Sequence, residues 1–341
     1  MAVKVGINGL GRIGSLVLRA GLGNRDLDFV AVNDLTNPEI LAYLFEFNSV
    51  HGLFRGTVEA RTNSLVVNGK EIKVFAERDP GKIPWSSVGA DIVIESTGRF
   101  ENKQDASKHL NGGAKKVIIT APAKGVDRTL VIGVNEDTYD PDKDDVVAMG
   151  SCTTHALALT ARVLQDRFGI RWGLMNTTHA YTNTQALLDK PVDKKRRSRA
   201  AAINLVPTTT GAAKAIGDVI PELDGKLDGW AIRAPVADGS ILDLTCILNR
   251  EITAEEINQA FREATKSKRL SKYLSFTDKE LVSSDIVGTE HSAIVDTTLT
   301  MAKGNLAKVF TWYDNEWSFA LRVVDLAAYV AAHLRAPARK R

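Results

Sequence analysis

The chain has two thiols, Cys152 and Cys246, and a thiol can be a nucleophile, a metal ligand or a packed core residue. Cys246 lies inside the apolar run "LDLTCIL", which favours a buried core thiol. Cys152 lies in "GSCTTHALALTARVL", where Ser151 can cap a helix whose apolar residues follow at helical spacing. Because a helix dipole stabilises a thiolate in the first turn, we favour a nucleophilic role for Cys152.

An activated thiol needs a base, and the candidate is His179 in "NTTHAYTNT". This histidine comes late in a predicted strand and leads into a polar loop. Sequence spacing alone does not bring His179 to Cys152, so a packed or surface histidine stays an open alternative at this point.

A second pattern is typical of dinucleotide binding. "VKVGINGLGRIG" places Gly9, Gly11 and Gly14 directly after a predicted strand and at the start of a helix. Such glycines allow a tight turn and let backbone amides approach a diphosphate at the helix N-terminus. Asp34 closes the next predicted strand, where a carboxylate can bond both ribose hydroxyls. It would repel a 2'-phosphate, so NAD is favoured over NADP. The alternative is a glycine turn followed by an ordinary surface aspartate.

Composition limits the class of protein that carries these residues. The 341 residues are 44% hydrophobic and 25% charged, which indicates a globular protein, and the length favours two domains. Two cysteines cannot build a disulfide framework and make a structural zinc site improbable, so we expect a reducing compartment and no metal. We expect that no apolar stretch approaches the roughly 20 residues of a membrane span and that there is no signal sequence, and hence a cytoplasmic protein. The net charge of +3 suits anionic small molecules better than nucleic acid.

The order of predicted elements indicates the fold class. Up to about residue 150, β-branched runs alternate with helical patterns, as in "VKVGI", "DFVAVND", "ADIVIE", "KKVIIT" and "TLVIGV". This alternation predicts a Rossmann-type, doubly wound parallel sheet, with a hairpin around Asn68-Gly69 and a helix near Gln104 to Leu110. The second part has longer strands and an amphipathic helix, "TAEEINQAFREAT", which predict an α+β domain with a mostly antiparallel sheet. The whole chain is therefore expected to be of the α/β class.

Further motifs are collinear across almost the whole chain. They are "INGLGRIG", "VND", "SVHG", "ESTGRF", "VIITAPAK", "GSCTT", "THAYTN", "RAAAINLVPTTTGAAKAIG" and "WYDNEW". Together they resemble phosphorylating glyceraldehyde-3-phosphate dehydrogenase. The resemblance implies an NAD-binding domain of residues 1–151 completed by a C-terminal helix of 318–341, and a catalytic domain of 152–317. It also implies a homotetramer and a role in glycolysis or gluconeogenesis.

The resemblance implies a role for each matching residue. Cys152 becomes the nucleophile that forms a thiohemiacetal and then a thioester, and His179 becomes its base. The positions that match the family's phosphate-binding residues are Ser151, Thr153, Thr182, Arg197, Thr210, Gly211 and Arg233. The positions that match its cofactor site are Gly9, Gly11, Arg12, Ile13, Gly14, Asp34, Arg78 and Thr120, with Ser96 and Thr97 nearby.

Two basic runs have other possible interpretations. As bare sequence, "DKKRRSR" at residues 193–199 is typical of a solvated loop or, less often, a nucleic-acid patch. The resemblance places this run in a loop at the active site, where the Arg197 guanidinium would bind phosphate. The tail "RAPARKR" is the second run.

The sequence departs from the family's pattern at His155, Ala156, Thr184 and Leu321. His155 follows the nucleophile by three positions and shares its helix face, so it either influences the thiol or packs as a neutral replacement. These departures keep two alternatives open. One is a dehydrogenase for a related phosphorylated aldehyde, such as erythrose 4-phosphate. The other is a catalytically weakened NAD-binding regulatory paralogue, for which Leu321, in place of an asparagine, is the best argument.

Overall fold

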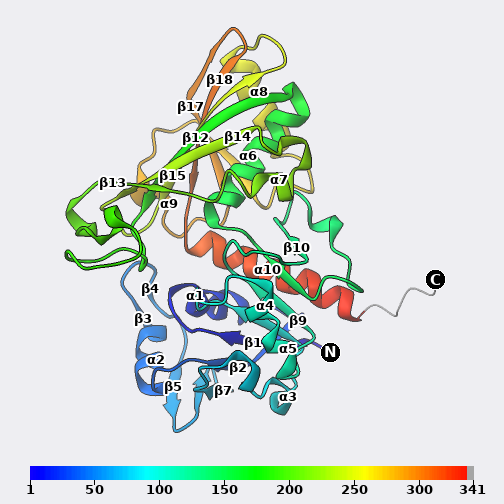
Figure 1. Ribbon diagram of the computed structural model, residues 1–341, viewed down its shortest axis with the longest axis vertical. Helices are drawn as coiled ribbons and strands as arrows, with labels where there is room; N and C mark the ends of the chain where they lie inside the picture. The colour runs from blue at the N-terminus through cyan, green and yellow to red at the C-terminus, as the bar shows by residue number, and fades with distance from the viewer. Residues whose placement is uncertain (336–341) are drawn as a thin grey trace. The chain divides into compact units, whose positions relative to one another are not determined.

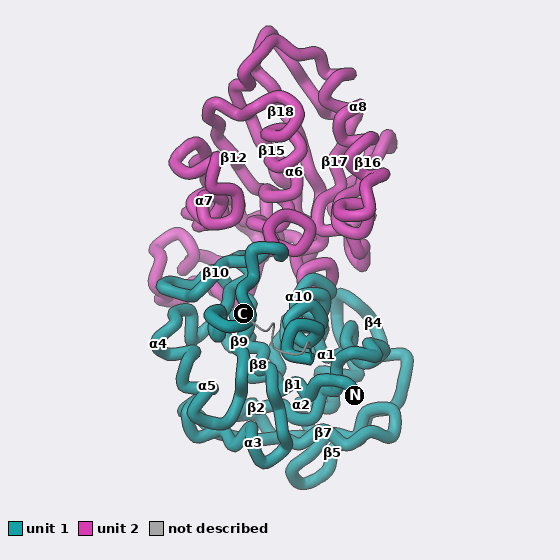
Figure 2. The backbone as a smooth tube through the Cα atoms, turned by 90° about the vertical axis from the view of Figure 1, so that its right-hand side faces the viewer, with its two compact units in different colours: residues 1–130, 136–150, 320–341 teal, residues 131–135, 151–319 magenta. Residues whose placement is uncertain are grey.

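The computed structural model describes residues 1–335, which divide into two compact units (Figure 2). Unit 1 comprises residues 1–130, 136–150 and the chain from residue 320 onward, and unit 2 comprises residues 131–135 and 151–319. The predicted division into 1–151 with 318–341, and 152–317, concerns which part binds NAD and stays a prediction. Residues 336–341 of the basic tail lie outside the described residues.

Unit 1 is built on a nine-stranded sheet in the order β10-β11-β9-β8-β1-β2-β7-β6-β5. The strands are β1 (Val3–Asn8), β2 (Leu27–Asn33), β5 (Val58–Arg61), β6 (Ser64–Val67), β7 (Lys70–Phe75), β8 (Ile92–Glu95), β9 (Lys116–Ile119), β10 (Arg128–Thr129) and β11 (Val146–Ala148). The central strand β1 pairs in parallel with β2 on one side and β8 on the other. This is the predicted doubly wound sheet. The order in which the chain adds strands reverses at β1, and such sheets bind ligands at that point.

The helices of unit 1 follow the expected local signals. They are α1 (Arg12–Gly21), α2 (Pro38–Glu46), α3 (Trp85–Val88), α4 (Lys103–Ala106) and α5 (Lys108–Asn111), with 3-10 turns at Pro80–Lys82 and Glu136–Thr138 and a small ribbon of β3 (Phe47–Asn48) and β4 (Gly52–Leu53) (Figure 1). Asn37 caps α2 by accepting a hydrogen bond from the N–H of Ile40, and Pro38 occupies the first turn.

One local prediction in unit 1 is confirmed and two need correction. Asn68 and Gly69 both have positive φ, 51° and 80°, as the tight turn of the predicted hairpin between β6 and β7 requires. The helix predicted near Gln104 is two short helices that are divided at Ser107, whose N–H and hydroxyl both donate to the Lys103 carbonyl. The strand predicted in "TLVIGV" ends at Thr129, since the chain then turns around Val131.

Unit 2 contains a seven-stranded sheet in the order β13-β14-β12-β15-β18-β17-β16. The strands are β12 (Ile170–Ala180), β13 (Val206–Thr209), β14 (Leu227–Ala234), β15 (Ser240–Leu248), β16 (Leu274–Thr277), β17 (Ala293–Lys303) and β18 (Leu306–Tyr313). Four of the six neighbouring pairs are antiparallel, and β12/β14 and β16/β17 are parallel. The predicted mostly antiparallel sheet is thus present, although β13 and β16 were not predicted.

The helices of unit 2 lie on both faces of this sheet. On one face are α6 (Cys152–Phe168), α7 (Ile216–Val219) and α8 (Ala254–Ala264), and α9 (Ser283–Ile286) packs on the other, where Ile286 joins Ile241, Ile294 and Trp312. There are 3-10 turns at Lys195–Ser198, Ala201–Ile203 and Pro221–Leu223. Both α6 and α8 contact β17, and alternate residues of β15 are buried beneath them. Cys246 is 1% exposed in this core, as predicted for a packed thiol.

The last helix, α10 (Trp317–Arg335), carries the chain from unit 2 back into unit 1. Its 19 residues are long and apolar enough for a membrane span, and it is the one helix within residues 1–335 that meets both criteria. The expectation that no apolar stretch reaches that length was therefore wrong. More than half of this apolar window is buried within the protein, as in the core helices of many globular proteins.

Candidate active site

The thiol of Cys152 and the imidazole of His179 meet in unit 2. Ser151 caps α6 through a capping box with Thr154, which places Cys152 at the first helical position. His179 is the next-to-last residue of β12, and its Nε2 lies 3.4 Å from Sγ of Cys152. The sequence could not establish this contact, and the structure brings the two predicted residues together.

Two main partners surround Nδ1 of His179. The carbonyl oxygen of Ala180, which can only accept, lies at 2.7 Å, and Nη1 of Arg233, which can only donate, lies at 2.8 Å, so the two contacts favour opposite tautomers. The tautomer that lets His179 act as a base has the proton on Nδ1, where it is donated to the Ala180 oxygen. Nε2 then carries the lone pair that can accept the thiol proton. Arg233 lies opposite His179 on the parallel strand β14, with Nη1 2.8 Å from Nδ1 and 2.9 Å from the Ala180 oxygen, to which it donates.

Burial opposes a charge on either partner alone. It raises the pKa of the Cys152 thiol to about 11, although Arg233 and the Thr153 amide work in the opposite direction. Burial and the neighbouring Arg233 lower the pKa of His179 to about 3. Transfer of the proton from sulfur to Nε2 leaves the net charge unchanged and creates an attracting pair at 3.4 Å. The thiolate and the imidazolium therefore form together.

A buried tyrosine that sequence reasoning missed supports this pair. Tyr313 OH lies 2.8 Å from Oγ1 of Thr153 and 2.7 Å from Oγ1 of Thr177, and its ring packs edge-on against His179. It thus joins the start of α6 to β12. Thr153, predicted to bind phosphate, has its hydroxyl engaged in this contact and is 4% exposed.

Two further cationic side chains of unit 2, Arg197 and Lys194, lie near Arg233. Arg197 donates from Nε to Thr208 and from Nη1 to Thr184, and Thr184 in turn contacts Thr182 at 2.9 Å. Lys194 donates to Thr209 at 2.5 Å. The pKa values of these cations are lowered, first by burial and then by their mutual repulsion. Such a cluster gains stability when an anion binds.

The remaining residues that were predicted to bind phosphate are Ser151, Thr210 and Gly211. Ser151 uses its hydroxyl for the helix cap, and Thr210 accepts from the N–H of Ala212 just after β13. Gly211 is exposed, and a Cβ there would meet no atom within 4 Å. Lys194 was not predicted, because only the folded loop reveals which residues of a basic run face the threonines.

The glycine turn of unit 1 has the shape that a dinucleotide requires. Gly9 has a φ of 92°, and a Cβ on Gly14 would lie 2.0 Å from the Gly9 oxygen, so both positions need glycine. A Cβ on Gly11 would meet nothing within 4 Å, which leaves the approach to α1 open. No side chain caps α1, so its first amides can serve a diphosphate. The residues thus fit an NAD-type cofactor.

Asp34 follows β2 and faces the glycine turn. Its carboxylate accepts hydrogen bonds from the N–H groups of Leu10 and Thr36 at 2.9 and 3.0 Å. Each bond fixes the orientation of the carboxylate and leaves lone pairs for ribose hydroxyls. The position therefore suits the predicted discrimination against a 2'-phosphate.

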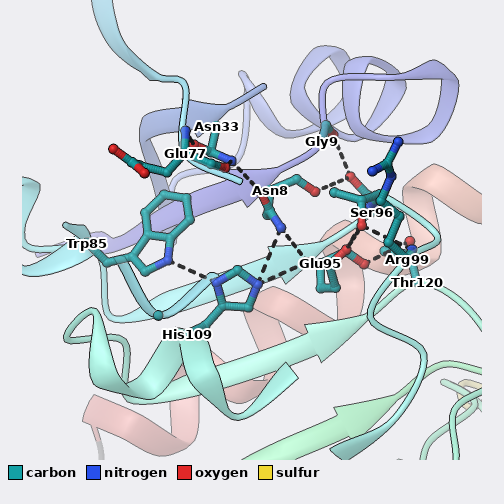
Figure 3. A network of polar contacts seen from close by, with 12 residues as sticks. Asn8, Gly9, Asn33, Glu77, Trp85, Glu95, Ser96, Arg99, His109 and Thr120 are labelled. Carbon is teal, nitrogen blue, oxygen red and sulfur yellow. Dashed lines mark hydrogen bonds and ion pairs between the residues drawn. The ribbon is translucent and has the colours of Figure 1, made fainter. Parts of the chain in front are cut away.

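Other predicted cofactor residues line the same edge of the sheet. Ser96 donates to the oxygens of Asn8 and Gly9, and Thr120 donates to the Glu95 oxygen (Figure 3). Arg12 and Ile13 begin α1 and are half-buried, while Arg78 is exposed beyond β7. All of these residues belong to unit 1.

His155, the departure closest to the nucleophile, is buried in the first turn of α6. Its Nδ1 lies 3.1 Å from the Ser151 oxygen, to which it donates, and its ring packs edge-on against Phe319. These contacts support the interpretation of a packed replacement.

An acidic group was also missed by sequence reasoning. Asp238 is buried beside Asp314 and Glu316 in unit 2, and burial together with these two carboxylates raises its pKa to about 8. Its Oδ1 accepts from the N–H of Asn315, whose side chain accepts from Ser240. Ser240 accepts from the N–H of Ala180, next to His179.

Comparison with known proteins agrees with this geometry. Residues 3–103 match the family model described as "Glyceraldehyde 3-phosphate dehydrogenase, NAD binding domain", and residues 151–315 match "Glyceraldehyde 3-phosphate dehydrogenase, C-terminal domain".

Several bacterial relatives are similar over nearly their whole length. Glyceraldehyde-3-phosphate dehydrogenase 1 of Bacillus subtilis is 53% identical over 332 residues, covering 97% of this chain and 99% of the relative. The enzyme of Geobacillus stearothermophilus is 53% identical over 333 residues, with 97% and 99% covered. That of Streptomyces coelicolor is 49% identical over 336 residues, with 98% and 100% covered.

Proposed function

The chain belongs to the glyceraldehyde-3-phosphate dehydrogenase family, and on this premise we propose how its residues carry out the family's reaction. The protein is an NAD-dependent oxidoreductase that oxidises glyceraldehyde 3-phosphate, with inorganic phosphate as the second substrate, in glycolysis. The observation that carries the assignment of roles is the 3.4 Å contact between Cys152 and His179 at the start of α6.

Cys152 is the nucleophile of the proposed mechanism. Its sulfur attacks the aldehyde carbon while the thiol proton passes to Nε2 of His179, and a thiohemiacetal forms. The developing alkoxide is held by the Nε2–H of His179 and by the backbone N–H of Cys152. Loss of a hydride turns the same carbon into a thioester. NAD, when bound, supplies the acceptor for that hydride.

Phosphate then completes the reaction. One of its oxygens attacks the thioester carbon and the C–S bond breaks. The product, 1,3-bisphosphoglycerate, leaves, and Cys152 remains as the thiolate. Arg197 and Arg233 offset the charge of the two phosphate groups, with Thr182, Thr210, Gly211, Ser151 and Thr153 around them. The cationic cluster supports this assignment because it holds more positive charge than its own contacts neutralise.

NAD would be held by unit 1. The first turn of α1, from Gly9 to Gly14 with Arg12 and Ile13, would bind the diphosphate, and Asp34 the ribose. Ser96, Thr97, Thr120 and Arg78 would complete the site. The open space at Gly11 and the orientation of Asp34 support this proposal.

We also propose a cytoplasmic homotetramer. The face of the unit 2 sheet opposite α6 and α8 exposes Trp172, Leu174 and Trp230 by 55, 58 and 58%. These side chains line an apolar hollow of about 500 Å³ with Leu306. An apolar patch of this kind is typical of an interface, and a second copy of the chain is the occupant we propose.

The direct test is NADH formation from glyceraldehyde 3-phosphate. We expect turnover that requires inorganic phosphate and NAD, is weaker with NADP, and is lost in Cys152→Ser. No phosphate-dependent turnover would contradict the function. The relatives are named for glyceraldehyde 3-phosphate and do not favour erythrose 4-phosphate as the main substrate. Erythrose 4-phosphate therefore serves as the comparison substrate in the same assay.

A further inference from the structure

A chain of hydrogen bonds between buried side chains runs beneath the glycine turn of unit 1 (Figure 3). Glu95, at the end of β8, is 2% exposed, and His109 on α5 is fully buried. His109 Nε2 lies 2.9 Å from Oε2 of Glu95, and Asn8 at the end of β1 donates to the same oxygen at 2.6 Å. The other carboxylate oxygen accepts from the N–H and the hydroxyl of Thr97, at 2.8 and 2.5 Å.

The two ends of this network determine where its protons lie. The indole of Trp85 can only donate, and its Nε1 lies 3.1 Å from Nδ1 of His109. Nδ1 is therefore the acceptor, and His109 is a neutral imidazole that donates from Nε2 to Glu95. Four hydrogen bonds from neutral groups thus hold Glu95 as a buried carboxylate.

The other end is oriented by the main chain. Asn33 accepts at Oδ1 from the N–H of Glu77 and donates from Nδ2 to the Glu77 oxygen and to Oδ1 of Asn8. This fixes the amide of Asn8 with its Nδ2 toward Glu95. Neither Asn8 nor His109 can turn an acceptor toward Glu95 without losing a partner of its own.

The network touches three segments that we assign to the cofactor. Asn8 precedes the glycine turn, Glu77 precedes Arg78, and Thr97 lies in the turn after β8. A Cβ on Gly9 would come within 2.9 Å of Thr97, so the glycine turn and the Thr97 turn pack directly against each other. A shift of Thr97 would therefore be transmitted to the glycine turn.

We propose that Glu95 is a positioning residue for the NAD site, which it preorganises by holding the Thr97 turn against the glycine turn. This inference rests on the proposed function of unit 1 as the NAD-binding part. Glu95 acts through Thr97 and needs no contact of its own with the cofactor. The proton arrangement of the network gives the proposal a specific test.

In Glu95→Gln, an NH2 group replaces one carboxylate oxygen. At the Oε2 position it would face the donors of Asn8 and His109, whose directions are fixed. The NH2 group must therefore face Thr97, and the N–H of Thr97 loses its acceptor. We expect the Thr97 turn to loosen while the contacts to Trp85 and Asn33 persist.

Calorimetric titration with NAD tests this expectation. Loss of a hydrogen bond to a charged acceptor should raise the dissociation constant about tenfold in Glu95→Gln. Asp144→Asn is the matched control, since Asp144 is a buried carboxylate of unit 1 bonded to Arg128 outside the network. It should lower the melting temperature and leave NAD affinity within twofold.

The outcomes distinguish failure of the positioning role of Glu95 from failure of the proposed NAD-binding function. An unchanged affinity in Glu95→Gln, or equal losses in both variants, would overturn the positioning role while the wild type still binds NAD. Failure of the wild type to bind NAD would overturn the proposed function itself. Hydrogen exchange of the cofactor-free wild type tests Glu95 even if the variant does not fold. The Thr97 amide should be protected, and exchange at the rate of an open loop would contradict the proposal.

Discussion

His179 and Arg233 are paired residues on the parallel strands β12 and β14, and Arg233 Nη1 lies 2.8 Å from Nδ1 of His179. A guanidinium in this position makes an isolated imidazolium costly. Burial lowers the pKa of His179 most, and Arg233 lowers it further. The imidazole can therefore hold a second proton, on Nε2, mainly while a thiolate lies beside it. This relationship makes Cys152 and His179 a single functional unit.

The pH dependence of alkylation tests this coupling. A thiol whose pKa is raised stays protonated at neutral pH and ionises only as the pH rises. In His179→Asn, which lacks the base, the rate of reaction with iodoacetamide at pH 7 should fall at least about tenfold and climb steadily toward pH 11. The wild type should react readily near neutral pH. Superimposable profiles would show that His179 does not accept the thiol proton.

Lys194 should contribute to phosphate binding. Lys194 and Lys195 are both exposed in this loop, and Lys194 is the one that donates to Thr209 at the cationic cluster. We expect Lys194→Met to raise the KM for inorganic phosphate, or that for the aldehyde phosphate, about fivefold because a charge-assisted contact is lost. Lys195→Met is the control. If both variants keep both KM values, Lys194 plays no part in anion binding.

The apolar face of the unit 2 sheet should be covered in solution by another copy of the chain. A charge at its centre would be buried without a partner, so Trp230→Asp should lower the mass measured by light scattering from that of a tetramer. Exposed Lys190→Asp serves as a control for added negative charge. A wild-type mass equal to one chain would contradict the proposed interface.

His155 should be structural. Its bond to the Ser151 oxygen and its packing on Phe319 account for its burial. We therefore expect His155→Asn to lower the melting temperature by a few degrees, as loss of one buried contact does, with no change in the pH profile of Cys152 alkylation. A displaced profile would assign the histidine an influence on the thiol.

Local signals in the sequence predict much of this fold. The N-cap at Ser151, the turn at Asn68-Gly69 and the glycines after β1 depend on neighbouring residues, and each appears where it was expected. The helix near Gln104 is present but divided at Ser107, where the Leu110 N–H bonds the Ser107 oxygen at a three-residue spacing. Propensity alone does not locate such a break.

The site is less predictable because tertiary pairing builds it. Tyr313 reaches Thr153 across 160 positions, and Arg233 meets His179 only through the strand order β14-β12. The raised pKa of Asp238 depends on carboxylates far along the chain. The resemblance to a family predicted which residues belong to the site. The contacts between those residues could be identified only in the folded structure.

The most direct test of the central claim is the mass of the intact protein after mixing with glyceraldehyde 3-phosphate and NAD without phosphate. We predict one phosphoglyceroyl adduct, located by peptide mapping on Cys152 and discharged by added phosphate. Cys152→Ser should show none, and Cys246→Ser should react as the wild type does. An adduct elsewhere, or turnover without any adduct on Cys152, would contradict the account.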